Sequence, residues 1–289
     1  MAPGSIIRSL EKDLLPRSAD LVARKAGILC RGGLSGSRDC DWYHGTWQYL
    51  RILDLVSSPT WHDEFYRFAI ERVLKRSREP ARILISGAAD YSMPLYVVMI
   101  AEAVPRLVEI TVVDLCPTPL FSCGWLSKRL SHDFRLVRGD VRSVDLGGPA
   151  RFDLICTDAF LTRFEKDETA EVLSAWEDLL DDHGHVITTA RLTEIELGGM
   201  GRQIYAEKLI KSAHERWQET HAGSKPALAE LSRRLDIYAK RVRSTPLGPA
   251  QDVADLLRTT FSIRHLEVAD VPDPLRPTQY LRVVMRKRE

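Results

Sequence analysis

The sequence predicts a doubly wound α/β fold with a seven-stranded, mostly parallel sheet. Two observations carry this prediction. Short apolar runs of strand length alternate with stretches of helix length over residues 81–192 and 249–286. Glycine or aspartate follows several of these runs directly, which is typical of parallel sheets whose strand ends meet a ligand. The 289 residues, 44% of them hydrophobic, are enough for one large domain and a subdomain.

The first strand and the loop after it are the most informative stretch. Residues 81–86 form an apolar strand, and a helix is expected over 92–103. Between them, Gly87, Ala88 and Ala89 leave little side chain between the backbone and a ligand. The helix N-terminus adds unpaired N–H groups and the positive end of a dipole. We therefore predict a nucleotide-like ligand at this loop.

Three further strands lead to acidic residues. Residues 109–113 end in Asp114, residues 134–137 are followed by Asp140, and residues 152–157 end at Asp158. The carboxyl ends of parallel strands line one crevice, so these aspartates and Gly87 are predicted to converge on one ligand. The remaining core elements are expected as helices over 117–130, 166–180 and 249–260 and strands over 185–189, 262–268 and 280–286, with a turn at 181–184.

Two helical regions flank this core. The N-terminal region should contain helices over 6–15, stopped by Pro16, and 18–30, then a helical stretch over 41–78 broken near Pro59. A second region, about 193–246, reads as a helical hairpin with a hinge at Gly198 and Gly199. We expect it over the open end of the sheet, although a dimer interface or mere packing explains it equally well. The predicted division is a helical cap and lid at 1–78, a core at 79–193 and 246–289, and a helical insertion at 194–245.

The order of four motifs resembles the class I S-adenosylmethionine-dependent methyltransferases. The motifs are Ile-Ser-Gly-Ala-Ala-Asp at 85–90, Val-Val-Asp at 112–114, Gly-Asp-Val at 139–141 and Phe-Asp-Leu-Ile-Cys-Thr-Asp at 152–158. The resemblance covers roughly residues 80–192 and 246–289 and implies a Rossmann-like core closed by one antiparallel strand. It departs from the family pattern at Ala88 and Ala89, where a glycine is often found, and this makes the loop stiffer.

The resemblance also implies a cofactor, S-adenosylmethionine, and residues that hold it. The Gly87 loop would face the methionine part, Asp114 the ribose and Asp140 the adenine amino group. The whole expected cofactor-binding set is Gly87, Ala88, Ala89, Asp90, Asp114, Leu115, Asp140, Val141, Asp158 and Ala159. Asp158 begins Asp-Ala-Phe-Leu, without the prolines that amine methyltransferases of this fold often carry there, and this disfavours DNA adenine methylation.

An aromatic run at 41–51 is the second feature of interest. Four rings supply faces on which a sulfonium cation could rest, or else pack the N-terminal helices onto the sheet: Trp42, Tyr43, Trp47 and Tyr49. We select Tyr43 and His44 as site residues and expect residues 31–62, which begin with a mobile glycine- and serine-rich loop, to form a lid. A base for the acceptor, where one is needed, would be Asp158, His44 or His62.

The composition of the chain argues against several classes of binding partner. With 41 basic and 40 acidic residues, the net charge of +1 creates no field that favours nucleic acid or an anionic membrane. The start of the sequence lacks the pattern of a secretory signal, and no apolar stretch approaches a bilayer span, so a cytoplasmic location is expected. The cysteines, Cys30, Cys40, Cys116, Cys123 and Cys156, lack the paired spacing of a zinc site. We interpret them as reduced thiols and expect no metal.

Three functions stay open at this point. The first is a methyltransferase acting on a small molecule, such as a specialised metabolite, by in-line displacement, with a homodimer as an open alternative to a monomer. The second is an enzyme that attacks another carbon of the sulfonium and releases methylthioadenosine, by cyclisation to azetidine-2-carboxylate or by aminocarboxypropyl transfer. The third is a nicotinamide-dependent oxidoreductase or a binding module. Its expected glycine pattern is missing, since Ala89 and Ser92 stand where glycines would be.

Overall fold

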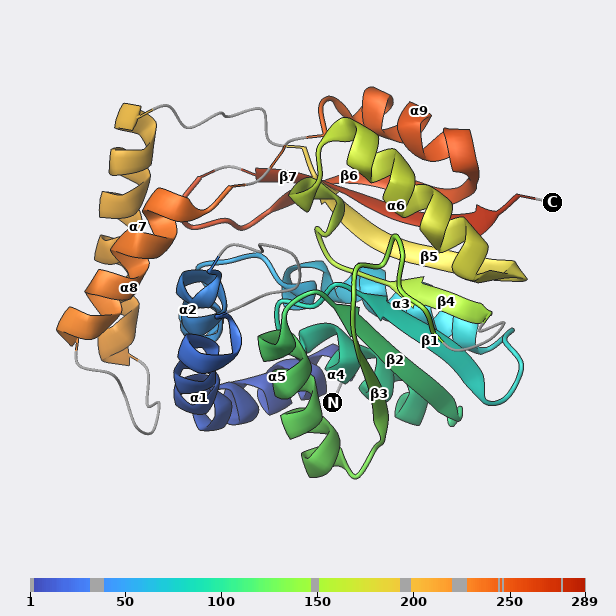
Figure 1. The fold of residues 1–289 in the computed structure, drawn as a ribbon, viewed down its shortest axis with the longest axis horizontal. Coiled ribbons are helices and arrows are strands. Elements are labelled where there is room, and N and C mark those ends of the chain that lie inside the picture. The colour runs from blue at the N-terminus through green and yellow to red at the C-terminus, as the bar shows by residue number, and fades with distance from the viewer. Residues whose placement is uncertain are drawn as a thin grey trace.

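Seven strands of the described chain form one sheet in the order β3-β2-β1-β4-β5-β7-β6 (Figure 1). The computed structural model describes residues 3–31, 39–146, 151–192, 199–219, 228–243, 245, 247–276 and 278–288. The strands are β1 (Ala81–Ser86), β2 (Val108–Asp114), β3 (Phe134–Arg138), β4 (Phe152–Cys156), β5 (Leu180–Arg191), β6 (Phe261–Val271) and β7 (Thr278–Lys287). All neighbours pair in parallel except β7, which runs antiparallel to β5 and β6. The predicted fold class is confirmed.

The central strands are buried on both faces, as their continuous apolar sequences require. Along β1, Ile83 and Ile85 pack into one hydrophobic cluster while Leu84, between them, packs into the cluster on the opposite face. Ser86 at the end of β1 pairs with Val113 near the end of β2. The loops that follow these two strands therefore leave the sheet side by side at the same edge.

Helices cover both faces of the sheet (Figure 1). One face carries α3 (Asp63–Leu74), α4 (Ser92–Ala103) and α5 (Pro117–Leu130), and the other carries α6 (Lys166–Leu179) and α9 (Ala250–Thr260). The N-terminal region adds α2 (Asp41–Ile52) and the 3-10 turn η2 (Pro59–His62), and a second turn, η3 (Leu161–Arg163), follows β4. The break near Pro59 and the starts of α4, α5 and α6 lie where the sequence predicts them.

The prediction of two helices separated at Pro16 is wrong. A single helix, α1 (Pro3–Leu29), runs through Pro16. Proline removes one amide donor and crowds the preceding turn, but it does not end a helix whose packing outweighs that cost. On either side of Pro16, Leu14, Leu15 and Ala19 are all at least 95% buried, which anchors both halves of the helix.

The predicted turn at 181–184 is also wrong, because β5 already begins at Leu180. Phe152 pairs with Leu180 and Leu154 pairs with His185, so β5 carries extra residues opposite β4 and bulges. A Cβ at Gly184 would lie 2.8 Å from the Phe152 carbonyl oxygen. Gly184 therefore marks a close approach between two strands rather than a turn. From sequence alone, a glycine inside an apolar pattern fits either interpretation.

The insertion forms two helices, α7 (Gly199–Glu219) and α8 (Leu228–Arg241), which lie side by side beyond α2 (Figure 1). Their apolar stripes, which include Leu209, Leu231 and Leu235, are buried against Leu50 and Leu53 of the α2 region. The inner face of the hairpin is thus covered within this chain. Gly198 and the glycine- and serine-rich loop over 32–37 lie outside the described residues. None of the described helices is both long and apolar enough to cross a membrane.

Candidate active site

The loop between β1 and α4 is fixed by a backbone bond and by an aromatic ring. The Gly87 N–H donates to the Val113 carbonyl oxygen at 2.9 Å. Gly87 has φ +72°, and a Cβ there would lie 2.2 Å from the Phe160 ring, which comes from the loop after β4. Both facts require glycine at this position. Because Phe160 alone imposes that requirement, Gly87 by itself does not establish a ligand.

Asp114, at the end of β2, ties together the two loops that the sequence predicts around a ligand. Its carboxylate accepts hydrogen bonds from the Ala88 N–H at 2.8 Å and the Cys116 N–H at 2.7 Å. An aspartate carboxylate has about four lone-pair sites, so two stay available to the hydroxyl groups of a ligand. Burial raises the pKa of Asp114 to about 6, and the nearby His44 and the two amides oppose that rise.

A pocket of about 450 Å³ adjoins Asp114 between the ends of β2 and β3. Leu115 and Asp140, both predicted cofactor residues, line it. Arg142 donates to the Asp140 carboxylate at 2.7 Å and holds the pKa of that carboxyl below its usual value. Val141, also predicted, is 95% buried and supports the loop from within. The pocket lies where the sequence predicts the base of a nucleotide.

Asp90, which the sequence places among the cofactor-binding residues, is buried and ion-paired. It is 97% buried, and Arg51 Nη1 donates to its Oδ2 at 2.6 Å. The same Arg51 also bonds the buried Glu11, and the Ser92 N–H donates to Asp90 Oδ1 at 2.9 Å. The Asp90 charge is thus matched inside the protein. We therefore interpret Asp90 as a structural residue that anchors α1 and α2 to the start of α4.

Asp158, just beyond β4, is held by two hydroxyl groups. Tyr66 Oη donates to its Oδ1 at 2.8 Å and Thr189 Oγ1 donates to the same atom at 2.6 Å. The adjacent Ala159, with φ +51°, donates its N–H to Thr189 Oγ1 at 3.0 Å. The two donors on one oxygen fix the orientation of the carboxylate. This fixed orientation suits Asp158 to positioning a polar group of a ligand.

The two histidines selected as candidate bases differ in surroundings. His44 stands edge-on to Tyr43, with ring centroids 5.0 Å apart, and its buried Nδ1 has no hydrogen-bond partner among the described residues. His62 is fully buried, and Arg282 Nε donates to its Nδ1 at 3.2 Å. Burial lowers the pKa of His62 to about 4, so the ring is neutral near pH 7. With one nitrogen engaged by Arg282, His62 is poorly placed to act as a base.

The buried, neutral His62 predicts a loss of stability in acid. A histidine whose folded pKa lies below its unfolded value of 6.5 stabilises the fold above pH 6.5, and this contribution is lost as the pH falls towards 4. Between pH 7 and pH 5 the wild type should lose about 2 kcal/mol more unfolding free energy than His62→Asn. Urea titrations at the two pH values measure this difference. His132→Asn serves as the control, and equal pH dependence of wild type and His62→Asn would refute the assignment.

The aromatic side chains divide between the site and the core. Tyr43 stacks on Trp47 and on Tyr238 of α8, with centroids 5.1 and 5.9 Å apart. Arg163 lies 4.7 Å from the Tyr43 ring centroid and donates to its hydroxyl oxygen at 2.6 Å. Tyr49 is 3% exposed and packs edge-on against Trp217 of α7, with ring centroids 6.4 Å apart. Tyr43 is therefore in position for a site role, whereas Tyr49 serves packing.

Arginine and tyrosine side chains gather on the Tyr43 side of the candidate site. Tyr43 and Asp114 are half-buried, whereas Arg163, which covers the Tyr43 ring, is exposed. Tyr238 and Tyr280 are both 97% buried. Three further side chains interact electrostatically with Tyr238 or Tyr280: Arg191, Arg276 and Tyr205. Guanidinium and phenol groups of this kind suit a planar, electron-rich or anionic compound.

Comparison with known proteins gives matches among solved structures and none among family models or curated sequences. Among solved structures, 1,6-didemethyltoxoflavin-N1-methyltransferase of Burkholderia thailandensis, with 1,6-didemethyltoxoflavin and S-adenosylhomocysteine bound, is 20% identical over 79% of this chain and 81% of that chain, with a TM-score of 0.50. The N-methyltransferase NodS of Bradyrhizobium japonicum, in complex with S-adenosylhomocysteine, is 14% identical over 83% and 99%, with a TM-score of 0.46.

The Burkholderia thailandensis structure shares its fold with this chain at a TM-score of 0.50. In this chain the sheet has the order β3-β2-β1-β4-β5-β7-β6, with β7 as its single antiparallel strand. The chain has the fold of the class I S-adenosylmethionine-dependent methyltransferases. At 20% identity this likeness concerns the fold alone. In a methyltransferase fold the ligand lies outside the carboxyl ends of the parallel strands, and this is the edge at which Gly87, Asp114, Asp140 and Asp158 stand.

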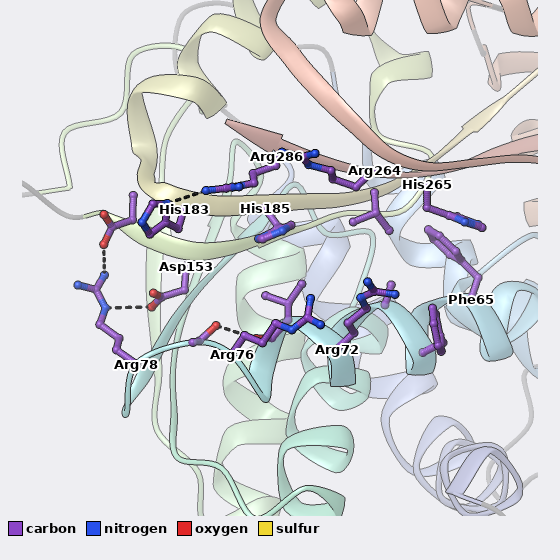
Figure 2. Close-up of a pocket in the computed structure, with 16 residues that line it drawn as sticks. Phe65, Arg72, Arg76, Arg78, Asp153, His183, His185, Arg264, His265 and Arg286 are labelled. Atoms are coloured by element: carbon purple, nitrogen blue, oxygen red, sulfur yellow. Dashed lines mark hydrogen bonds and ion pairs between the residues drawn. The ribbon is translucent and has the colours of Figure 1, made fainter. Parts of the chain in front are cut away.

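A groove of about 720 Å³ lies at the opposite edge of the methyltransferase fold (Figure 2). Arg72 and Arg76 line it from the α3 side, and His185 and Arg264 line it from the sheet. Burial and the nearby Arg286 and Arg264 lower the pKa of His185 to about 4. Because it adjoins the amino ends of β4 and β5, this groove does not belong to the candidate active site.

Sequence reasoning missed three residues that shape the site. Tyr66 and Thr189 fix Asp158, and Arg163 covers Tyr43, across sequence separations of 92, 31 and 120 residues. Tyr66 carries a weak signal, because it forms an aromatic pair with Phe65 shortly after the 41–51 run. Thr189 and Arg163 carry no local signal. The expectation of no metal also rested on local spacing, whereas Cys30, Cys40 and Cys116 meet in the fold.

Proposed function

We propose that this protein is an S-adenosylmethionine-dependent methyltransferase that acts on a small molecule. The observation that carries the proposal is Asp114. Its carboxylate lies at the carboxyl end of β2 between the Ala88 and Cys116 amides and beside a pocket lined by Leu115 and Asp140. An acidic residue at this position of a doubly wound sheet accepts hydrogen bonds from the two ribose hydroxyls of a nucleotide. Because the chain has the methyltransferase fold, we infer that this nucleotide is S-adenosylmethionine.

The residues present fit this cofactor. Asp114 would accept from the ribose, Leu115 would contact the adenine ring, and Asp140 would accept from its amino group. Ala88 and Ala89 would face the methionine part, and Ala159 would lie beside it. When bound, S-adenosylmethionine supplies a methyl group on a positively charged sulfur for in-line displacement. The aromatic group around Tyr43 stands near Asp114 and would stabilise that charge by about 0.5–2 kcal/mol.

The chain's own part in the reaction is alignment and exclusion of water. Asp158, fixed by Tyr66 and Thr189, would orient a polar group of the acceptor or of the cofactor. Tyr43 and Tyr238 close the site from α2 and α8, which keeps water away from the reacting atoms. Methyl transfer by in-line displacement requires no catalytic triad. The described residues around Asp158 need only hold the cofactor and the acceptor in line.

The arginine and tyrosine side chains near Tyr43 indicate the class of acceptor. Arg163, Arg191 and Arg276 lie among tyrosine rings, and Arg276 stands 5.6 Å from the Tyr205 ring centroid. Such a group of side chains would bind a flat, electron-rich compound with an acidic group, as many specialised metabolites are. The near-neutral chain, with a net charge of +1, offers no general attraction for nucleic acid.

Replacing Asp114 tests the proposal. Asp114→Ala should weaken binding of S-adenosylmethionine by about 1.5–3 kcal/mol, or roughly 10- to 150-fold, because a charged hydrogen-bond partner is lost. Isothermal titration calorimetry of both proteins measures the change, and circular dichroism shows that the variant is folded. Asp133→Ala, at the far end of β3, is the matched control. Unchanged affinity in Asp114→Ala would remove this carboxylate from the cofactor site.

A further inference from the structure

Three cysteines from distant parts of the sequence meet next to Asp114. Cys30 follows the end of α1, Cys40 precedes α2, and Cys116 precedes α5. The Cys116 Sγ lies 3.6 Å from the Cys30 Sγ and 3.6 Å from the Cys40 Sγ, and all three sulfur atoms lie within 4.8 Å of one another. Cys30 and Cys116 are 3% and 9% exposed, and Cys40 is half-buried. The thiols form one shielded cluster.

The separation of the sulfur atoms fits a metal better than a disulfide. In a tetrahedral zinc site with Zn–S bonds of about 2.3 Å, neighbouring sulfurs are about 3.8 Å apart. A disulfide requires about 2.05 Å. All three cysteines are free thiols in this structure. Packing alone rarely gathers three polarisable thiols from three elements, and three thiolates are a strong ligand set for a thiophilic divalent cation.

His44 is the candidate for a fourth ligand. His44 lies four residues after Cys40, so both project from the same side of the first turn of α2. His44 interacts with Cys116, but its ring nitrogens do not lie within 4.8 Å of all three sulfur atoms, so the ring has to turn towards them to bind a shared ion. The buried Nδ1 of His44 has no hydrogen-bond partner among the described residues. A buried, unsatisfied ring nitrogen costs about 1–3 kcal/mol, which a metal bond would offset. Thr118 Oγ1, 3.1 Å from the Cys30 Sγ, can donate a hydrogen bond to a thiolate.

We propose that Cys30, Cys40 and Cys116, with His44 as the fourth ligand, bind one zinc ion. Three cysteines and one histidine complete a tetrahedral shell, which is the closed arrangement of structural rather than catalytic zinc. The ion replaces the thiol protons and forms four metal–ligand bonds, with no change of oxidation state. It fastens the end of α1, the start of α2 and the loop after β2 to one another.

This site would also support Asp114. The Cys116 N–H donates to Asp114 Oδ1 at 2.7 Å, so a metal that fixes Cys116 fixes the carboxylate as well. This consequence rests on the proposed function, since it matters only where Asp114 binds the cofactor. The metal site itself does not depend on that function, and metal content can be measured without any activity.

The experiment uses the full-length protein produced in zinc-supplemented medium. Mass spectrometry of the metal content should find one zinc per chain. After removal of zinc, titration with cobalt(II) chloride should give thiolate-to-cobalt charge-transfer bands and the intense visible bands of a tetrahedral ion. Cys40→Ser and Cys116→Ser should lose the zinc, and His44→Ala should keep the charge-transfer bands with altered visible bands. Cys123→Ala and Cys156→Ala, outside the cluster, should keep both metal and spectrum.

Several results would overturn the proposal. Wild type without zinc and without cobalt charge-transfer bands would exclude the site, and so would metal that survives in Cys116→Ser. A disulfide between Cys30 and Cys116, found by mass spectrometry of the unreduced protein, would make the pair a redox couple instead. Where the serine variants fail to fold, the wild-type cobalt spectrum decides the matter alone. Loss of zinc with unchanged S-adenosylmethionine binding would leave the metal site standing and remove only its link to Asp114.

Discussion

Arg51→Met should lower the free energy of unfolding by about 3–5 kcal/mol, since removing one partner of a buried ion pair leaves its counter-charges without compensation. Arg51 is held between Glu11 and Asp90, which are 4% and 3% exposed, and the Arg51 side chain itself is 2% exposed. Methionine retains much of the arginine stem's volume and its helix propensity. The loss therefore reports the charge and not a cavity.

The pH dependence of this loss gives a second check. Burial already raises the pKa of Glu11, with Arg51 opposing it. Without Arg51 the pKa of Glu11 should rise further, so the folded variant takes up a proton more readily than its unfolded chain. A raised carboxyl pKa favours the folded state at low pH, and the penalty should be smaller at pH 5 than at pH 8.

Urea unfolding of wild type and Arg51→Met at pH 5 and pH 8 measures both effects. Arg17→Met is the control, because Arg17 lies in α1 and pairs with Asp13 on the exposed surface, where a pair contributes less than about 1 kcal/mol. Equal losses in the two variants, or a loss from Arg51→Met that does not change with pH, would contradict the network.

Gly87→Ala should cost about 2–5 kcal/mol of stability. The left-handed φ of +72° adds about 1–2 kcal/mol for a residue with a side chain. The new Cβ would lie 2.2 Å from the Phe160 ring, and relief of such overpacking costs about 1–3 kcal/mol. Displacing Phe160 would also disturb its contacts with Phe164 and Trp176.

A double-mutant cycle separates the two causes. In a Phe160→Ala background the clash is gone and only the backbone cost should remain, so Gly87→Ala should become less destabilising by about 1–3 kcal/mol. Gly27→Ala is the matched control. Gly27 lies in α1 with nothing within 4 Å of its built Cβ, so alanine should stabilise the helix by about 0.5–1 kcal/mol. An additive cycle would show that Phe160 does not press on Gly87 in solution.

What the sequence predicted correctly depends on local, repeated signals. The strands of the parallel core are short runs rich in apolar and β-branched residues, so the strand ends at Asp114 and Asp140 could be found from the chain alone. Parallel pairing then brings those ends to one edge, and that geometric rule needs no knowledge of side-chain contacts. The same signals failed at Pro16 and at Gly184, where tertiary packing overrides what a single residue favours.

The missed parts of the site depend on contacts between distant elements. Asp158 could be located at a strand end, but Tyr66 and Thr189 reach it from a helix and a neighbouring strand. Asp90 was assigned to the cofactor by its place beside Gly87, and its neutralisation by Arg51 became visible only in the fold. The cysteine cluster follows the same rule, because Cys30 and Cys116 are 86 residues apart.

We expect this chain to bind S-adenosylmethionine at the Asp114 edge of the sheet. The decisive experiment is a calorimetric titration of the purified full-length protein with S-adenosylmethionine, with the ligand recovered afterwards and analysed by mass spectrometry. We expect one saturable site per chain and intact S-adenosylmethionine in the absence of an acceptor. Release of methylthioadenosine would replace methyl transfer with attack on another carbon of the sulfonium, and absence of saturable binding would exclude the cofactor site.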